Sequence, residues 1–403
     1  MRHHGDMARA LLLDAARTPF GGYRGGLSGV RVDDLAAEPI AELLRRGRSR
    51  GLDPEAVEEI FYGNTNGAGE ENRNVARMAG LLAGAPESVP GVTVNRLCGS
   101  GGEALLQATR ALRGEDAELV IAGGVEGMSR APFVLPRSER SLPDRLEVIS
   151  TARGWRMVNP RMNPHWTVPL GRAAELTALE VGLSRTELDE YALRSHRRAA
   201  AAWDAGVHDG FVVPLRTPEG ATIRGDESVR PDLGMTKLEG LAPAFSPNGP
   251  VTAGNSAPLG DGAVAALLGS RRRAELLGVE PLGELLTGVT VAREPQRFAL
   301  APVAAVHKLL RKLGVGISEV VLWEINEAFA ALVLAVLRQL PEIPLDRVNV
   351  HGGALAYGHP FGGSFARAVV DLCRHLYHRG GGLGVAVAGI GVGQALAIAA
   401  RVE

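Results

Sequence analysis

The stretch Asn95–Leu112, "NRLCGSGGEALLQATRAL", places a cysteine between a β-rich run and a helix. A short run of β-branched residues precedes it, and Ala104, Ala108 and Leu112 recur at helical spacing after it. The Gly-Ser-Gly-Gly after Cys98 allows close approach of backbone or substrate, because glycine has no side chain. The stretch therefore predicts a strand–turn–helix unit with a thiol at the turn.

Two readings of Cys98 are open. Unpaired N–H groups and the positive dipole end at a helix N-terminus favour a thiolate, which is the reactive form of a nucleophilic cysteine. Cysteine is also among the most often buried residue types, where it acts as a small hydrophobic group. The second cysteine, Cys373 in "AVVDLCRHL", lies among helical apolar residues, so we expect it to be a core residue.

A nucleophilic cysteine needs a base, and His359 is the strongest candidate. It lies in "GGALAYGHPFGGS", where the surrounding glycines and the following proline predict a rigidly held loop with space around the ring. Asn326, in "EINEAFA", ends an apolar β-like run at the start of a helix. Its amide could orient a water molecule or cap that helix, and capping is the commoner role of asparagine.

Strands alternate with helices in both parts of the 403-residue chain, which predicts an α/β fold with a largely parallel, buried sheet. Residues 129–255 differ, because they are rich in arginine, proline and polar residues. One helix is predicted there, and Ser184 and Glu187 have the spacing of a capping box at its start. Two α/β halves of similar size therefore flank an inserted segment.

Composition narrows the class of protein. A formal net charge of −1 gives no overall attraction to nucleic acid or to an anionic membrane. Two cysteines rule out a disulfide framework and suit a reducing cytoplasm, although one bridge between them stays open. No apolar run reaches the ~18 residues of a membrane span. The 52 glycines cluster at strand–helix junctions, which indicates tight turns in a compact enzyme.

Several motifs together resemble the thiolase family of acyl-CoA C-acyltransferases. They are "ARTPFGGYRG", "NRLCGSGG", "GGVEGMSRAP", "VTAGNSAPLGDGA", "INEAFA" and "NVHGGALAYGHPFGGS", in the order and spacing of that family. The resemblance runs along nearly the whole chain. It implies two duplicated βαβαβαββ halves that form a five-layered αβαβα core.

The resemblance also implies domain boundaries. Residues 1–128 and 256–284 would form the N-terminal half with Cys98, and residues 285–403 the C-terminal half with Asn326 and His359. Residues 129–255 would form a loop domain that covers coenzyme A. Like other members, the chain would act on coenzyme A thioesters without a permanently bound cofactor or metal, as a homodimer or homotetramer.

The roles of single residues follow from the same resemblance. Cys98 would take the acyl group, His359 would activate the thiol, and Asn326 with His359 would form an oxyanion hole. The backbone N–H groups of Cys98 and Gly391 would form a second one. Coenzyme A would meet Arg230 at its nucleotide end, although Arg230 also suits an ordinary exposed surface. The pantetheine channel would be lined by Phe245, Ala253, Ser256 and Ala257.

The chain departs from the family at a second cysteine. The stretch "AGIGVGQA" (Ala388–Ala395) aligns with the family's last motif and has Gly389 where the general acid/base cysteine belongs. Glycine has no titratable side chain, so acylation of Cys98 is better supported than making or breaking a carbon–carbon bond. Smaller departures are His351 before the two glycines of the histidine loop, Pro169-Leu170-Gly171, and Ser256-Ala257-Pro258.

Three hypotheses follow. The chain is an active C-acyltransferase in which water or a nearby residue (His351, Tyr357 or Ser364) replaces the missing thiol. Alternatively, it transfers the acyl group to an amine, an alcohol or water, none of which needs an α-carbon deprotonated. The third hypothesis is a catalytically weak subunit, against which the joint presence of Cys98, His359 and Asn326 argues.

Overall fold

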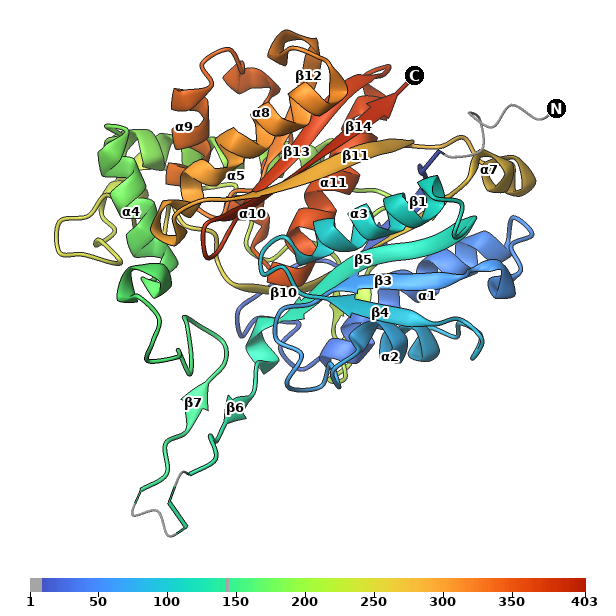
Figure 1. Cartoon of the computed structure of the whole chain (residues 1–403), viewed down its shortest axis with the longest axis horizontal. Coiled ribbons are helices and arrows are strands. Elements are labelled where there is room, and N and C mark those ends of the chain that lie inside the picture. The colour runs from blue at the N-terminus through green and yellow to red at the C-terminus, as the bar shows by residue number, and fades with distance from the viewer. Residues whose placement is uncertain (1–8, 139, 142–144) are drawn as a thin grey trace.

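The computed structural model describes residues 9–138, 140–141 and 145–403, and these are built around one long mixed sheet (Figure 1). The strand order is β12-β13-β14-β11-β1-β10-β5-β3-β4, with β2 paired to β10. In chain order the strands are β1 (Leu11–Arg17), β2 (Gly21–Gly22), β3 (Glu59–Gly63), β4 (Gly91–Val94), β5 (Leu119–Gly127), β10 (Gly260–Gly269), β11 (Gly283–Ala292), β12 (Val320–Ile325), β13 (Gly382–Ile390) and β14 (Gln394–Val402).

The helices form three layers around the two parts of this sheet. Helices α1 and α2 cover the outer face of β1, β10, β5 and β3, while α8 covers the outer face of β11, β13 and β14. Helices α3 and α11 pack against each other and against both parts of the sheet, so they form the middle layer. The bounds are α1 (Val32–Arg48), α2 (Val75–Leu82), α3 (Ser100–Arg113), α7 (Arg271–Leu277), α8 (Ala301–Leu313), α9 (Ala330–Gln339), α10 (Ala354–Tyr357) and α11 (Phe361–His378).

The five-layered αβαβα core and its two repeated halves are therefore confirmed. The first half runs β1-α1-β3-α2-β4-α3-β5-β10, and the second runs β11-α8-β12-α9-α11-β13-β14. The third strand of the second half is reduced to a single bridge between Trp323 and Val348. Separate hydrophobic cores lie under the outer helices of each half and around the middle helices.

The expectation of a largely parallel sheet was wrong. Strand β3 runs parallel to β4 and β5, and β12 runs parallel to β13. However, β10 is antiparallel to β1 and β5, and β14 is antiparallel to β11 and β13. The short connection Gly391–Gly393 between β13 and β14 explains part of this, because a tight turn can join only antiparallel strands.

The inserted segment holds β6 (Phe133–Val134), β7 (Ile149–Ser150), α4 (Leu170–Glu180), α5 (Arg185–Asp204), β8 (Leu215–Arg216), β9 (Thr222–Ile223) and α6 (Met235–Glu239). Helices α4 and α5 of the inserted segment pack on the second half of the core, while its later part contacts the first half, where Asp226 pairs with Arg17 at 2.6 Å. The capping box of Ser184 and Glu187 at the start of α5 is confirmed. Helices α4 and α5 contact α9, and the β6–β7 hairpin projects away from the body (Figure 1). Among the described residues, no helix is long and apolar enough to cross a membrane.

Candidate active site

Cys98 lies in the turn between β4 and α3, two residues before the helix begins at Ser100. The Ser100 hydroxyl fixes this turn: it donates to the Leu97 carbonyl at 2.6 Å and accepts the Arg96 N–H at 2.9 Å. Leu97 has a φ of +49°, a left-handed conformation that is unusual for a branched side chain. Such strain is typical of backbone that is held in place for a functional purpose.

The two middle helices approach closely beside this turn. A Cβ added to Gly101 in α3 would collide with the Gly362 carbonyl in α11, and one on Gly102 would collide with the Phe365 ring. The glycines after Cys98 therefore let the N-terminus of α11 lie against the N-terminus of α3. Because the loop that precedes α11 carries His359, this contact brings the cysteine loop and the histidine loop together.

Cys98 is buried, with 6% of its surface exposed. Burial raises the pKa of its thiol to about 12, although the backbone N–H groups of Cys98 and Gly391 hydrogen-bond to it and lower the pKa, and the nearby Glu126 carboxylate raises it further. The expectation that the helix terminus would favour a thiolate is thus corrected, because desolvation outweighs the two N–H donors. The resting group is a neutral thiol.

Gly391 lies immediately after β13, where its N–H reaches Cys98. The next residue, Val392, has a φ of +61°, again a strained conformation for a β-branched residue. A Cβ on Gly391 would lie 3.1 Å from the Trp155 ring and 3.2 Å from Leu97 Cδ1. Both N–H groups at the thiol therefore adjoin a residue in a left-handed conformation.

His359 is held by its backbone and by one ring nitrogen. Its N–H donates to the Pro258 carbonyl at 2.8 Å, and its Nδ1 lies 2.7 Å from Ser364 Oγ. The Nε2 atom is buried and has no hydrogen-bond partner among the described residues. Burial, with a smaller effect of the Arg367 charge, lowers the pKa of His359 to about 3, so the imidazole is neutral at physiological pH.

Asn326 is also buried, and neither oxygen nor nitrogen of its side-chain amide has a partner in the described part of the chain. Its backbone N–H donates to Val387 of β13 at 2.9 Å, which fixes the residue at the end of β12. An unpaired buried amide is costly, so its atoms are available to a ligand or water. The amide does not cap α9, which begins four residues later.

Two buried carboxylates that the sequence analysis missed support these loops. Glu126 accepts from the Thr65 hydroxyl at 2.7 Å, the Asn64 amide at 3.3 Å and three backbone N–H groups, including that of Gly362 at 3.0 Å. Glu327 accepts from Tyr191, Ser195, Asn349 and the Leu355 N–H. Glu126 lies within β5 and Glu327 follows β12, and each was a weak sequence signal because its partners lie far away in the chain.

The structure separates the three residues considered as replacements for the missing thiol. Ser364 contacts His359 directly. Tyr357 instead donates to the His351 carbonyl and lies 3.1 Å from His208 Nε2. The His351 ring packs edge-on against His375 at 4.1 Å. Of the three, only Ser364 makes a described contact with the predicted base.

The residues expected to bind coenzyme A lie at the edge of the inserted segment. Phe245 is 40% exposed and packs edge-on against Phe329, three residues after Asn326. Ser256 forms a bridge with Phe329, and the Ala257 N–H donates to Ala328 at 3.1 Å. Ala253 and Arg230 are exposed, and the Arg230 N–H donates to His196 Nδ1 at 3.2 Å.

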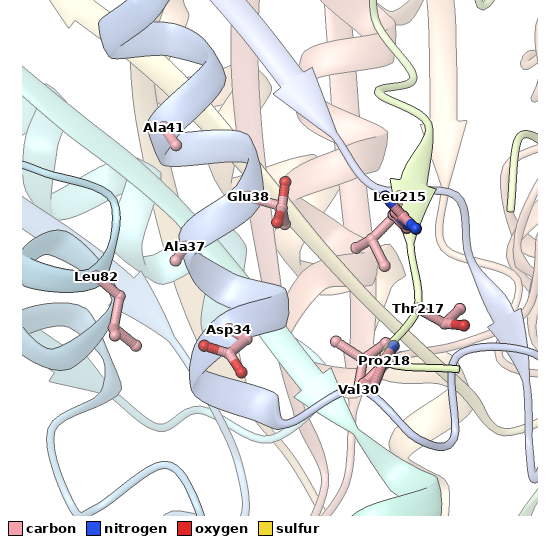
Figure 2. Close-up of a pocket in the computed structure, with 10 residues that line it drawn as sticks. Val30, Asp34, Ala37, Glu38, Ala41, Leu82, Leu215, Thr217 and Pro218 are labelled. Carbon is pink, nitrogen blue, oxygen red and sulfur yellow. The ribbon is translucent and has the colours of Figure 1, made fainter. Parts of the chain in front are cut away.

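Figure 2 shows a different pocket, of about 360 Å³, between α1 and the β8 segment. Its lining includes Asp34, Glu38 and Thr217 and contains none of the predicted site residues. No group of three or more histidine, cysteine or acidic residues with metal-binding geometry occurs in the described part of the chain.

Comparison with known proteins agrees with this fold. The model of the thiolase N-terminal domain matches residues 10–272, and that of the thiolase C-terminal domain matches residues 279–402. The chain belongs to the thiolase family.

Similar curated proteins and structures extend the match over the whole chain. Beta-ketoadipyl-CoA thiolase of Escherichia coli is 43% identical to this chain, and the alignment covers 97% of this chain and 99% of that protein. The protein of that name from Pseudomonas putida is 44% identical, and the alignment covers 98% of this chain and 99% of that protein. The crystal structure of human mitochondrial 3-ketoacyl-CoA thiolase in complex with CoA matches with a TM-score of 0.90 and 33% sequence identity. The match covers 98% of this chain and 99% of the human chain. The chain is thus a thiolase-type acyl-CoA acyltransferase.

Proposed function

We propose that the chain catalyses thiolysis of 3-oxoacyl-CoA, or the reverse Claisen condensation of two acyl-CoA molecules, through an acyl group carried on Cys98. The observation that carries this proposal is the pair of backbone N–H groups, from Cys98 and Gly391, that hydrogen-bond to the same thiol. Donors placed in this way would stabilise the oxyanion that forms when the thiol attacks a thioester. His359 would accept the thiol proton at its free Nε2, and Asn326 would bind the oxygen of the second substrate.

The acyl group we propose ends in a carboxylate, as in a β-ketoadipyl chain. The support is twofold: relatives over 40% identical along the whole chain are named beta-ketoadipyl-CoA thiolases, and Arg156, which follows Trp155, has no acidic partner among the described residues. Arg156 donates to the Thr151 carbonyl at 3.1 Å and to Asn66 Oδ1 at 3.4 Å, both of which are neutral. A half-buried guanidinium with neutral partners can accept a substrate carboxylate as its counter-ion.

Contacts link Arg156 to both sides of the thiol. Its neighbour Trp155 borders the Gly391 backbone. Its partner Asn66 donates a backbone N–H to Glu126 at 3.2 Å, and the Glu126 charge acts on Cys98. An acyl chain on Cys98 that passes Trp155 would therefore lead toward the Arg156 guanidinium.

Coenzyme A would lie against the inserted residues 129–255, between the N-terminal half (1–128 and 256–284) and the C-terminal half (285–403). The nucleotide would meet Arg230, and the pantetheine would pass Phe245, Ala253, Ser256 and Ala257. This path is supported by the exposure of Arg230 and Phe245, and by the contact of Phe245 with Phe329 after the Asn326 loop. It is tested by comparing KM for coenzyme A between the wild-type protein and the variant Arg230→Ala.

A homo-oligomer in a reducing cytoplasm is also proposed. Exposed apolar side chains on the projecting β6–β7 hairpin, among them Phe133 (70% exposed) and Val148 (63% exposed), support a contact with a second copy. Both cysteines are free and buried, as expected in a reducing compartment. Light scattering of the wild-type protein and of the variant Phe133→Ser/Val148→Ser tests the oligomer.

A second candidate function is acyl transfer to an amine, an alcohol or water. The observation that favours it is Gly389, where the family pattern has its acid/base cysteine. None of these acceptors requires removal of a proton from carbon, so the missing group would not be needed.

One experiment tests both candidates. The intact mass of the protein is measured after mixing with 3-oxoadipyl-CoA, succinyl-CoA or acetyl-CoA, and then after adding coenzyme A, acetyl-CoA or an amine. A Cys98-dependent adduct that yields a carbon–carbon product supports the thiolase reaction. An adduct cleared only by an amine or by water supports the altered acceptor, and no adduct with any of the three thioesters contradicts both.

A further inference from the structure

We propose that His359 carries the proton in both half-reactions, and that Leu332 fills the space where a second acid/base side chain would stand. This inference rests on the proposed carbon–carbon chemistry and specifies how that chemistry proceeds without a titratable group at Gly389.

The first observation is the packing around Gly389 in β13. A Cβ at this position would lie 2.6 Å from Leu332 Cδ1, 3.3 Å from the Phe298 carbonyl oxygen and 3.4 Å from Pro302 Cγ. Leu332 is fully buried in α9, the helix that follows the Asn326 loop. The space beside Gly389 is therefore occupied by an apolar side chain, and a residue with a larger side chain fits only if Leu332 moves or is shortened.

The second observation is that the two buried glutamates and the serine around the site already have hydrogen-bond partners, while the Asn326 amide, unpartnered in the described part of the chain, has no group that titrates. The two oxygens of Glu126 accept five hydrogen bonds, and those of Glu327 accept four. The Ser364 hydroxyl lies against His359 Nδ1. In contrast, Nε2 of His359 has no partner among the described residues. Among the groups named here, it is thus the titratable atom that these contacts leave free to accept a proton.

The protons balance with this one carrier. During acylation, the Cys98 proton passes to His359 Nε2, the sulfur bonds to the acyl carbon, and the departing coenzyme A thiolate takes the proton. During condensation, Nε2 removes a proton from the α-carbon of the second acyl-CoA. That carbon bonds to the acyl carbon, the Cys98–acyl bond breaks, and the Cys98 sulfur takes the proton from Nε2. Thiolysis is the reverse sequence.

The resting protonation states agree with this sequence. The raised pKa of Cys98 and the lowered pKa of His359 make both the thiol and the imidazole neutral in the resting protein. Ser364 fixes the ring through Nδ1, which keeps Nε2 available. A single proton therefore travels between sulfur, nitrogen and carbon without requiring a stable ion pair in the buried site.

Deuterium uptake tests the role of His359. The acylated enzyme is incubated in D₂O with acetyl-CoA, and mass spectrometry measures exchange into its methyl group. We expect His359→Gln to slow both acylation and exchange about 10²–10⁴-fold. The matched control His351→Gln, whose ring packs against His375, should change both by less than about threefold. Acylation that slows while exchange persists in His359→Gln would overturn the proposal.

Restoring a thiol tests the role of Leu332. We expect Gly389→Cys alone to raise the rate of 3-oxoacyl-CoA cleavage less than about twofold, because Leu332 occupies the space. The double variant Gly389→Cys/Leu332→Ala should raise it at least about tenfold over Leu332→Ala, because the new thiol can then act as acid/base. Circular dichroism checks that each variant is folded. An equal gain in the single variant would contradict the role of Leu332.

The same experiments distinguish failure of this proposal from failure of the proposed function. If the wild-type protein forms no adduct on Cys98, the proposed function is wrong. If the adduct forms and α-proton exchange proceeds normally in His359→Gln, only the single-carrier mechanism is wrong.

Discussion

Gly391 and Gly389 lie two residues apart at the end of β13, yet their surroundings differ in kind. The N–H of Gly391 reaches the Cys98 thiol, and its space for a Cβ faces Trp155 and Leu97. The space beside Gly389 faces Leu332 and Pro302 in the outer core. The N–H of Gly391 thus acts on the Cys98 thiol, while the space for a side chain at Gly389 is filled by apolar packing.

The largest expected effect is the loss of acylation when Cys98 is replaced. Replacement of Cys98 by alanine should abolish the adduct and lower turnover at least about 10⁴-fold, because the nucleophile is removed. The matched variant Cys373→Ala, in the core of α11, should keep at least about half of the activity. Intact-mass analysis and steady-state turnover measure both. An adduct that still forms in Cys98→Ala would contradict the assignment of Cys98 as the acylated residue.

The raised pKa of Cys98 predicts how alkylation depends on pH. A group whose pKa is raised stays protonated, so the thiolate fraction should rise about tenfold per pH unit. Between pH 7 and pH 10 the rate of iodoacetamide alkylation at Cys98 should therefore grow about 10³-fold, since the pKa is about 12. Mass spectrometry of the labelled peptide measures it, with Cys373 followed in the same samples. A rate that levels off below pH 8 would indicate a thiolate–imidazolium pair instead.

Replacement of Asn326 should affect the two half-reactions to different extents. Its unpaired amide should bind the thioester oxygen of the second substrate, so Asn326→Ala should slow carbon–carbon cleavage about 10²–10³-fold. Formation of the adduct from an acyl-CoA should slow less than about tenfold. Rapid-quench measurement of each half-reaction separates the two rates. Equal losses in both would show that the amide serves acylation as well.

Arg156 gives the smallest effect and concerns the acyl group alone. Its charge should attract a terminal carboxylate, so Arg156→Gln should raise KM for 3-oxoadipyl-CoA about tenfold or more. KM for an uncharged 3-oxoacyl-CoA of equal length should not change. Steady-state kinetics with the two substrates provide the comparison. A similar change in both KM values would point to disturbed packing around Asn66.

Cys98, His359 and Asn326 are each flanked by their own strand, turn and helix residues, so local patterns were sufficient to propose them as site residues. The five-layered fold followed from the resemblance. The mixed sheet was not predicted from alternation of strands and helices, because that pattern does not show the direction of strands joined through a long insertion.

Residues whose role depends on distant parts of the chain were missed. Glu126 meets Gly362 from 236 positions away, and Trp155 borders Gly391. Leu332 resembles any other apolar residue on a helix until its contact with Gly389 is seen. The pKa of Cys98 was misjudged for a related reason, because burial by the whole fold outweighs the local effect of the helix terminus.

The most direct measurement is the intact mass of the wild-type protein and of Cys98→Ala after mixing with succinyl-CoA, followed by addition of acetyl-CoA. We expect one succinyl group on Cys98 of the wild-type protein, which is lost again as 3-oxoadipyl-CoA forms. A succinyl group that remains until an amine or water removes it, or that also appears on Cys98→Ala, would contradict carbon–carbon bond formation through Cys98.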